Sequence, residues 1–228
     1  RVLCLKGQKL KKRLCKEPAK FDVLAHHPIN VGGPGRKALN PDDISTPDIG
    51  ELRRILVKAQ RTGRALPRKP KKPIWATEIW WDSKPPDPQG VPQKRHARWM
   101  AQSFYLLWKQ RVERVVWFLI RDQAANGNFA ASVQSGLYTN DGQPKLARQA
   151  FAFPFVADAG KGATKLWGVA PARGKVKVER KRAGGWKRIK TLKAKGGSRV
   201  FTGRARVKRG SKLRAVQGGA LSVPYKAG

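Results

Sequence analysis

Acidic residues are scarce in this sequence of 228 residues, which has 14 Asp and Glu against 50 Lys and Arg and a formal net charge of +36 at pH 7. Cysteine is rarer still: Cys4 and Cys15 are the only two, and they form no CxxC motif. The common thiol redox motifs and zinc ribbons are therefore excluded. No apolar run approaches the length of about 18 residues that a membrane-spanning helix needs, so we expect no membrane span.

The two cysteines and the first residue bear on whether the protein is exported and whether the chain is processed. Ten residues separate Cys4 from Cys15. A disulfide between them would close a basic loop in an exported protein, whereas a cytosolic protein would keep two free thiols, and the sequence leaves both open. The first residue is Arg1 and the only methionine is Met100. We therefore expect a processed product or a fragment, without the signal peptide of an exported protein.

Apolar content and charge distribution predict two domains. Hydrophobic residues make up 40% of the chain and include 8 Trp and 8 Phe, which is enough for a packed core. Residues 161–228 contain 21 Lys and Arg with a single acid, Glu179, whereas residues 1–160 contain 29 Lys and Arg with 13 acids. This shift predicts a domain over residues 1–158, a linker at 159–163 and a basic domain over 164–228.

The pattern of the first domain is typical of an α/β fold. Short, continuously apolar runs at 21–25, 74–77 and 115–120 predict strands, and helical periodicity follows each of them. The predicted helices begin near Thr46, Gln93 and Leu146. Continuously apolar strands are typical of a parallel sheet covered on both faces. Polar residues follow each strand at its C-terminal end, where such folds place their chemistry.

The second domain has the pattern of an antiparallel β fold. Apolar and basic residues alternate in short segments that Gly pairs separate. The predicted strands are 175–179, 186–190, 199–201, 204–207 and 212–216. The alternation favours a small β-sandwich-like domain with a basic outer face over a disordered tail.

Four segments in order carry a family resemblance. Residues 72–81 have the sequence KPIWATEIWW, which resembles the seventh strand of retaining glycoside hydrolases of the clan A barrels, the group that includes the cellulase-like family five and the xylosidase-like family thirty-nine. Residues 22–28 and 114–122 are similar to the sixth and eighth strands of these barrels. Residues 135–145 resemble the Gly-Leu-aromatic to Asp-Gly-x-Pro-Lys segment that closes many of them. The resemblance covers roughly residues 20–155 and depends on the order and spacing of individually weak motifs.

The resemblance implies a fold, an activity and site residues. The fold would be the C-terminal part, about three βα units, of a TIM (β/α)8 barrel, followed by the small all-β domain. Glu78 would be the nucleophile of a retaining glycosidase that hydrolyses the O-glycosidic bonds of an oligo- or polysaccharide. No metal or cofactor is implied. The predicted substrate-binding residues are His27, Trp117, Trp80, Trp81 and Asp122.

The sequence departs from the family in one respect. The general acid/base of these enzymes sits in an Asn-Glu pair at the end of the fourth strand, and no Asn-Glu pair occurs in the sequence. We therefore expect a fragment that is inactive alone and that requires the missing N-terminal half of the barrel. The expected substrate is a carbohydrate, and the expected location is extracellular or associated with the cell envelope.

Each prediction has a simpler alternative. Glu78 could be an ion-pair partner of a Lys or Arg, the tryptophans could be packing residues, and Asp122 could be a helix cap or the partner of an arginine. The alternative function is a basic module that binds a polyanion, either an acidic glycan or a nucleic acid, through residues 164–228 on a non-catalytic barrel scaffold. A catalytically lapsed sugar-binding barrel is the third hypothesis.

Overall fold

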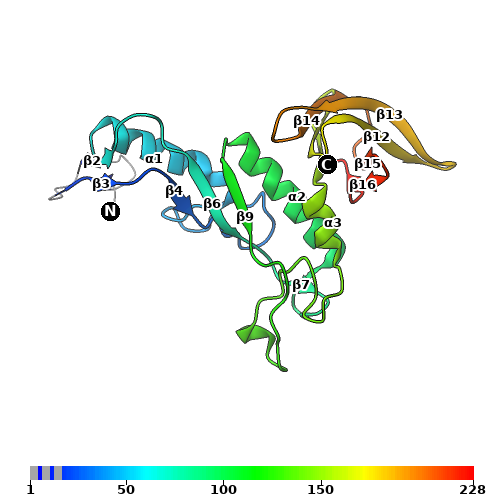
Figure 1. Cartoon of the computed structure of the whole chain (residues 1–228), viewed down its shortest axis with the longest axis horizontal. Coiled ribbons are helices and arrows are strands. Elements are labelled where there is room, and N and C mark those ends of the chain that lie inside the picture. Colours follow the sequence, from blue (N-terminus) through cyan, green and yellow to red (C-terminus); the bar gives the residue numbers. More distant parts are fainter. Residues whose placement is uncertain (1–4, 7–10, 13–16) are drawn as a thin grey trace. The chain divides into compact units, whose positions relative to one another are not determined.

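The computed structural model of the chain describes residues 5–6, 11–12 and 17–228 (Figure 1). Cys4 and Cys15, and with them the disulfide hypothesis, lie outside the described residues. The chain divides into two compact units, the first made of Arg1–Ile79 and Leu106–Trp117 and the second of Trp80–Tyr105 and Phe118–Gly228. These bounds differ from those of the domains predicted from the charge distribution. Both helices and strands are present, with strands in the majority, so the fold is mixed α/β.

A parallel sheet is the framework of the first unit. Its strands are β4 (Leu24–His26), β6 (Ile74–Ile79) and β9 (Arg114–Trp117), in the order β4-β6-β9. Both pairings are parallel, as the apolar runs predicted, and Figure 1 shows the three strands side by side. Two short pairs of strands complete the unit: parallel β3 (Ala19–Lys20) with β5 (Ala65–Leu66), and antiparallel β1 (Leu5–Lys6) with β2 (Lys11–Lys12).

The helix of the first unit confirms the prediction from periodicity. A 3₁₀ turn, η1 (Thr46–Asp48), with Pro47 at its start, leads directly into α1 (Ile49–Arg61). Ile49, Leu56 and Ala59 lie buried along one face. Gly63 follows the helix with a φ of 72°, a left-handed conformation in which an L side chain is strained and glycine is favoured.

The helices of the second unit also lie where the sequence predicted them. α2 (Gln93–Lys109) is the long helix, and its last residues belong to the first unit. α3 (Leu146–Ala152) is the last helix of the chain. A short parallel pair, β7 (Ser83–Lys84) with β8 (Val91–Pro92), precedes α2, and a 3₁₀ turn, η2 (Phe129–Ala131), lies between the two helices.

Two antiparallel sheets form the rest of the second unit. One has the strands β10 (Phe155–Ala159), β11 (Thr164–Val169) and β14 (Val200–Ala205). The other has β12 (Gly174–Arg182), β13 (Gly185–Ala194), β15 (Lys212–Gln217), β16 (Ala220–Leu221) and β17 (Tyr225–Lys226). One buried cluster contains Leu166 and Phe201 from the first sheet and Val176, Val178 and Leu213 from the second. The two sheets therefore share one core.

Three details of the β region differ from the sequence-based expectation. Residues 159–163, predicted as a linker, are the end of β10 and the turn of the β10–β11 hairpin, in which Ala159 pairs with Thr164. β10 itself lies in the segment assigned to the barrel. The separate strands predicted at 199–201 and 204–207 are wrong, because Val200–Ala205 forms one strand. The change in charge density lies where exposed strand faces become basic, and β10 has no exposed position.

Candidate functional site

Two of the predicted site residues meet at the ends of β4 and β6. In the register of the two strands His26 lies opposite Ala76, so His27 follows β4 close to the last residues of β6. Nδ1 of His27 lies 3.5 Å from Oε2 of Glu78. The Glu78 side chain is 24% exposed and that of His27 is 53% exposed. The carboxylate is thus partly sheltered by the sheet and still open to solvent at the carboxyl edge of the strands.

A bulge in β6 accounts for the exposure of Glu78. Ala76 pairs with Val115 and Ile79 pairs with Trp117, so Thr77 and Glu78 together lie opposite the single residue Val116. A β-bulge bends the strand and changes the direction of the side chains that it contains. Ile79 is fully buried after the bulge, while Thr77 and Glu78 are both partly exposed. Without the bulge, strict alternation would bury Glu78 after Ala76. With it, Ile79 takes the buried position and the Glu78 carboxylate stays partly exposed.

The loop after His27 is held by side-chain hydrogen bonds. His26 Nε2 lies 2.8 Å from the carbonyl oxygen of Ile44. The Asn30 amide donates to the carbonyl oxygen of Arg36, and the Asp48 carboxylate accepts from the amide of Ala38. The bond of His26 holds the residue before His27, and the other two hold the loop that follows it. The two adjacent histidines have different environments, since His26 contacts the loop and His27 contacts Glu78.

The predicted tryptophans have mostly buried rings. Trp117 ends β9 and is 7% exposed. In the second unit Trp81 is also 7% exposed and its ring centroid lies 5.5 Å from that of Trp99. Trp80 is less buried, and its ring lies 6.4 Å from Phe118. Of the three, Trp80 offers the most surface to a ligand.

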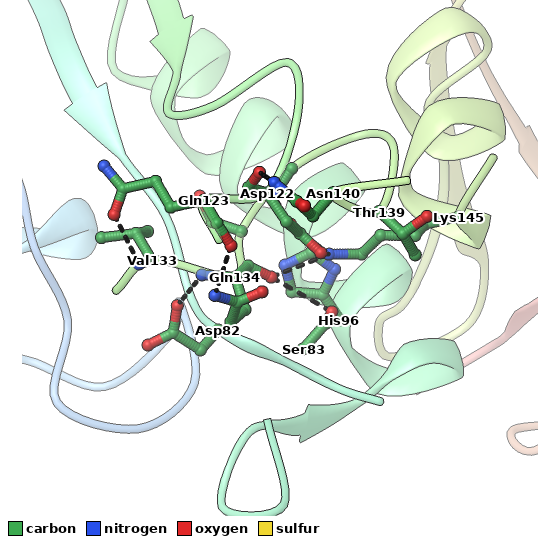
Figure 2. Close-up of polar contacts among 12 residues, drawn as sticks. Asp82, Ser83, His96, Asp122, Gln123, Val133, Gln134, Thr139, Asn140 and Lys145 are labelled. Carbon is green, nitrogen blue, oxygen red and sulfur yellow. Dashed lines mark hydrogen bonds and ion pairs between the residues drawn. The ribbon is translucent and has the colours of Figure 1, made fainter. Parts of the chain in front are cut away.

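Asp122 lies in a buried ion pair (Figure 2). Nζ of Lys145 lies 2.8 Å from its Oδ1 and 2.9 Å from its Oδ2, and both side chains have almost no exposed surface. The amide of Gly136 donates to Oδ1, and the Asn140 side chain donates to the Asp122 carbonyl oxygen. Nζ of Lys145 also donates to the carbonyl oxygen of Gln134. The carboxylate of Asp122 is thus enclosed by the second unit.

A polar network that the sequence analysis did not single out surrounds this ion pair (Figure 2). The amide of Gln134 donates to Oδ1 of Asp82 at 2.6 Å, and burial raises the pKa of Asp82. His96 Nε2 lies 2.8 Å from the carbonyl oxygen of Trp81, and burial lowers the pKa of His96 to about 4. Burial likewise lowers the pKa of Lys145, against the opposing effect of Asp122. The network therefore fixes the segment 80–92 to α2 and to the segment 122–145.

The sequence contains a weak signal for this network. His96 precedes Met100 by one helical turn, on the face of α2 that is buried, and Lys145 stands directly before α3. A polar residue on the apolar face of a helix indicates a buried hydrogen bond. Among the described residues no group of His, Cys, Asp or Glu has the arrangement of a metal site. Within the same residues no helix has the length and apolarity required to cross a membrane.

Comparisons with known proteins give a distant structural similarity and no sequence match. No protein-family model matches the chain, and no curated protein is significantly similar to it. A solved structure of a family 39 glycoside hydrolase from the gut symbiont Bacteroides cellulosilyticus WH2 is similar to 86% of this chain, with 14% identity and a TM-score of 0.47. An engineered protein is similar to 91% of the chain, with 11% identity and a TM-score of 0.27. The chain spans 44% and 49% of those two structures.

Proposed function

We propose that this chain supplies the nucleophile of a retaining glycoside hydrolase that acts on the O-glycosidic bonds of an oligo- or polysaccharide, and that Glu78 is that nucleophile. The contact of Glu78 with His27 at the carboxyl edge of β4 and β6 is the observation that carries the proposal. In parallel α/β folds this edge is where catalytic side chains gather. The bulge at Thr77 and Glu78 adds to this, because bulges often lie beside active sites.

The reaction gives each group a defined role. A carboxylate oxygen of Glu78 forms a bond to the anomeric carbon, and the bond to the leaving oxygen breaks as an acid protonates it. The same group, now a base, takes a proton from a water molecule, which attacks the carbon and releases Glu78. His27 positions the carboxylate through its contact with Oε2. In the unit that holds Glu78, the exposed edge of Trp117 is the apolar surface that we propose for a sugar ring, and Asp122 is omitted because its side chain has no exposed surface.

We propose that the acid/base comes from polypeptide outside these residues. A retaining enzyme needs a second carboxyl group about 5–5.5 Å from the nucleophile. In the described part of the chain β4 and β9 each pair along one edge only, so the sheet has two edges at which strands of a barrel would continue. In this proposal the first unit is part of a (β/α)8 barrel, and the protein acts outside the cell or at its envelope, where polysaccharides are found.

Covalent trapping tests the role of Glu78 without the acid/base. Dinitrophenyl 2-deoxy-2-fluoro glycosides have a leaving group that departs without protonation, so a nucleophile alone is sufficient to form the glycosyl-enzyme. A panel of such sugars is incubated with the full chain, and intact and peptide mass spectra are recorded. We expect one sugar adduct, on the peptide that contains Glu78.

Three variants make the result specific. Glu78→Gln should abolish the adduct, whereas Glu113→Gln, which changes an exposed glutamate next to β9, should retain it. His27→Ala should slow the labelling while Glu78 remains the labelled residue. An adduct that persists in Glu78→Gln, or that forms on a different residue of the unchanged chain, would show that Glu78 is not the nucleophile.

A further inference from the structure

The second sheet of the second unit has one strongly basic side. Val176 and Val178 of β12 are buried in the shared core, and the side chains that alternate with them point away from it. Alternation in β15, and in β13 the pairing with β12 across a bulge, place further residues on this outer side, which we call the basic face. Its cationic residues are Lys175, Lys177, Lys181, Arg188, Lys193, Lys212 and Arg214. All of these except Arg214 are exposed.

The cations of the basic face are close together and are not balanced by acids. Residues two apart on a strand are separated by about 6.6–6.8 Å, and neighbouring strands by about 4.8 Å. Glu179 is the one acidic residue on this face among the described residues, and Nε of Arg214 lies 2.8 Å from its Oε2. The charge of Glu179 is therefore largely compensated by Arg214, and the lysines of the hairpin have no acid opposite them.

One cross-strand pair is unfavourable for folding. Lys175 of β12 lies directly opposite Lys193 of β13. Two like charges in this position destabilise a sheet, and Lys177 adds a third charge two residues further along β12. Dissolved salt relieves only part of this repulsion at an exposed surface. An anion that bridges the two strands would turn the repulsion into attraction.

Trp186 is the aromatic residue of this face, and two cationic side chains lie over its ring. Cζ of Arg214 lies 4.4 Å from the ring centroid, and Nζ of Lys181 lies 5.8 Å from it. Proteins that bind single-stranded nucleic acids stack successive bases on several open aromatic faces. One partly covered ring does not provide such a platform. A two-stranded ribbon such as β12 with β13 can enter the major groove of duplex DNA, so duplex DNA is the competing ligand that the test includes.

We propose that the basic face of β12, β13 and β15 binds a linear anionic polysaccharide, with carboxylate or sulfate groups of successive sugars bridging the lysines of the two hairpin strands. Recognition depends on charge spacing along an extended chain rather than on base stacking. This goes beyond the proposed hydrolysis and does not depend on Glu78. Binding at this face would hold an acidic polymer to the protein whether or not that polymer is cleaved.

A charge-reversal variant with a matched control tests the proposal. The full chain is titrated with heparin as the sulfated probe and polygalacturonate as the carboxylated probe, and duplex DNA and poly(dT) are measured alongside at the same ionic strength. The face variant is Lys175→Glu/Lys177→Glu/Lys193→Glu. The control variant, Lys84→Glu/Lys94→Glu/Arg95→Glu, changes the net charge equally at exposed residues of the same unit. Far-UV circular dichroism checks that both variants fold.

The expected result is a loss of polysaccharide affinity of at least about tenfold in the face variant and about twofold or less in the control. The plot of log affinity against log salt should also become less steep in the face variant, because fewer counterions are released on binding. Binding of heparin but not of polygalacturonate would identify sulfate as the recognised group. Binding of polygalacturonate but not of heparin would identify carboxylate. Equal losses in the two variants would overturn the proposal, as would tighter binding of either DNA than of both polysaccharides.

Discussion

The ammonium of Lys145 lies 2.8 Å from Oδ1 of Asp122, with 1% and 0% of the two side chains exposed. Nζ of Lys145 also donates to the carbonyl oxygen of Gln134, and Oδ1 of Asp122 accepts from the amide of Gly136. Each charge is thus compensated by its partner and by backbone groups. A buried pair adds little to stability as a whole, but removal of one partner leaves the other charge buried and unpaired.

This predicts a large effect of Asp122→Asn. The variant should lose about 3–5 kcal/mol of the free energy of unfolding, since Lys145 would remain buried without its anion. Asp141→Asn is the control, because Asp141 is exposed in the same segment and should change stability by less than about 0.5 kcal/mol. Urea unfolding followed by circular dichroism measures both. A cost for Asp122→Asn no larger than that of Asp141→Asn would mean that the pair does not contribute to the fold.

His96 predicts a loss of stability in mild acid. Burial lowers its pKa from 6.5 to about 4, so between these values the unfolded chain binds a proton that the folded chain does not. The stabilising effect is complete above pH 6.5, declines as the pH falls, and is lost by about pH 4. The difference in pKa corresponds to about 3 kcal/mol of unfolding free energy.

Unfolding curves at a series of pH values test this effect. His96→Gln should lower stability at pH 7, because the hydrogen bond to the Trp81 carbonyl is disturbed, and should make the curve of stability against pH flatter between pH 6.5 and 4. The difference between the curves of the unchanged protein and of His96→Gln isolates the contribution of His96 from that of the carboxylates, which titrate in the same pH range. Parallel curves for the two proteins would contradict the assignment to His96.

The close packing around Gly168 of β11 predicts a third difference in stability. A Cβ at this position would lie 2.7 Å from the carbonyl oxygen of Pro154 and would also overlap the ring of Phe201. Gly168→Ala should therefore cost about 1–3 kcal/mol through overpacking of the shared core. Gly184 lies at the tip of the β12–β13 hairpin, where a Cβ would meet nothing within 4 Å. Gly184→Ala should be close to neutral, and equal melting temperatures of the two variants would contradict the packing argument.

The apolar runs made the strands of the first unit predictable. Each run is continuous and its neighbours are polar, so the pattern predicted β4, β6 and β9 and their parallel pairing. Ile49, Leu56 and Ala59 likewise identified α1 by their spacing. β10 could not be found in this way, because its border was placed by charge and Phe155 belongs to a core that β11 and β14 complete.

The candidate site was predictable only in part, for a related reason. His27 follows β4 and Glu78 lies near the end of the adjacent strand β6, so the edge rule of parallel sheets predicted polar side chains from both strands at one edge. Asp122 also follows a strand, yet its partner Lys145 is 23 residues away and both are buried. A pattern of residue types does not show whether a carboxylate at a strand end is open or enclosed. The bulge at Glu78 was equally invisible, since it depends on the register with β9.

Lys175 predicts a conflict between stability and binding on the basic face. Lys175→Glu replaces a like-charge pair opposite Lys193 with an attractive pair, and should raise the free energy of unfolding by about 0.5–1 kcal/mol. The same change should weaken heparin binding, because it removes a cation and adds an anion where the polymer is proposed to lie. Lys84→Glu has no such partner in the sheet and should leave both quantities nearly unchanged. A gain in stability without a loss in binding would show that the repulsion at Lys175 and Lys193 is unrelated to an anionic ligand, and a loss of both would show that the two lysines do not repel each other in the folded protein.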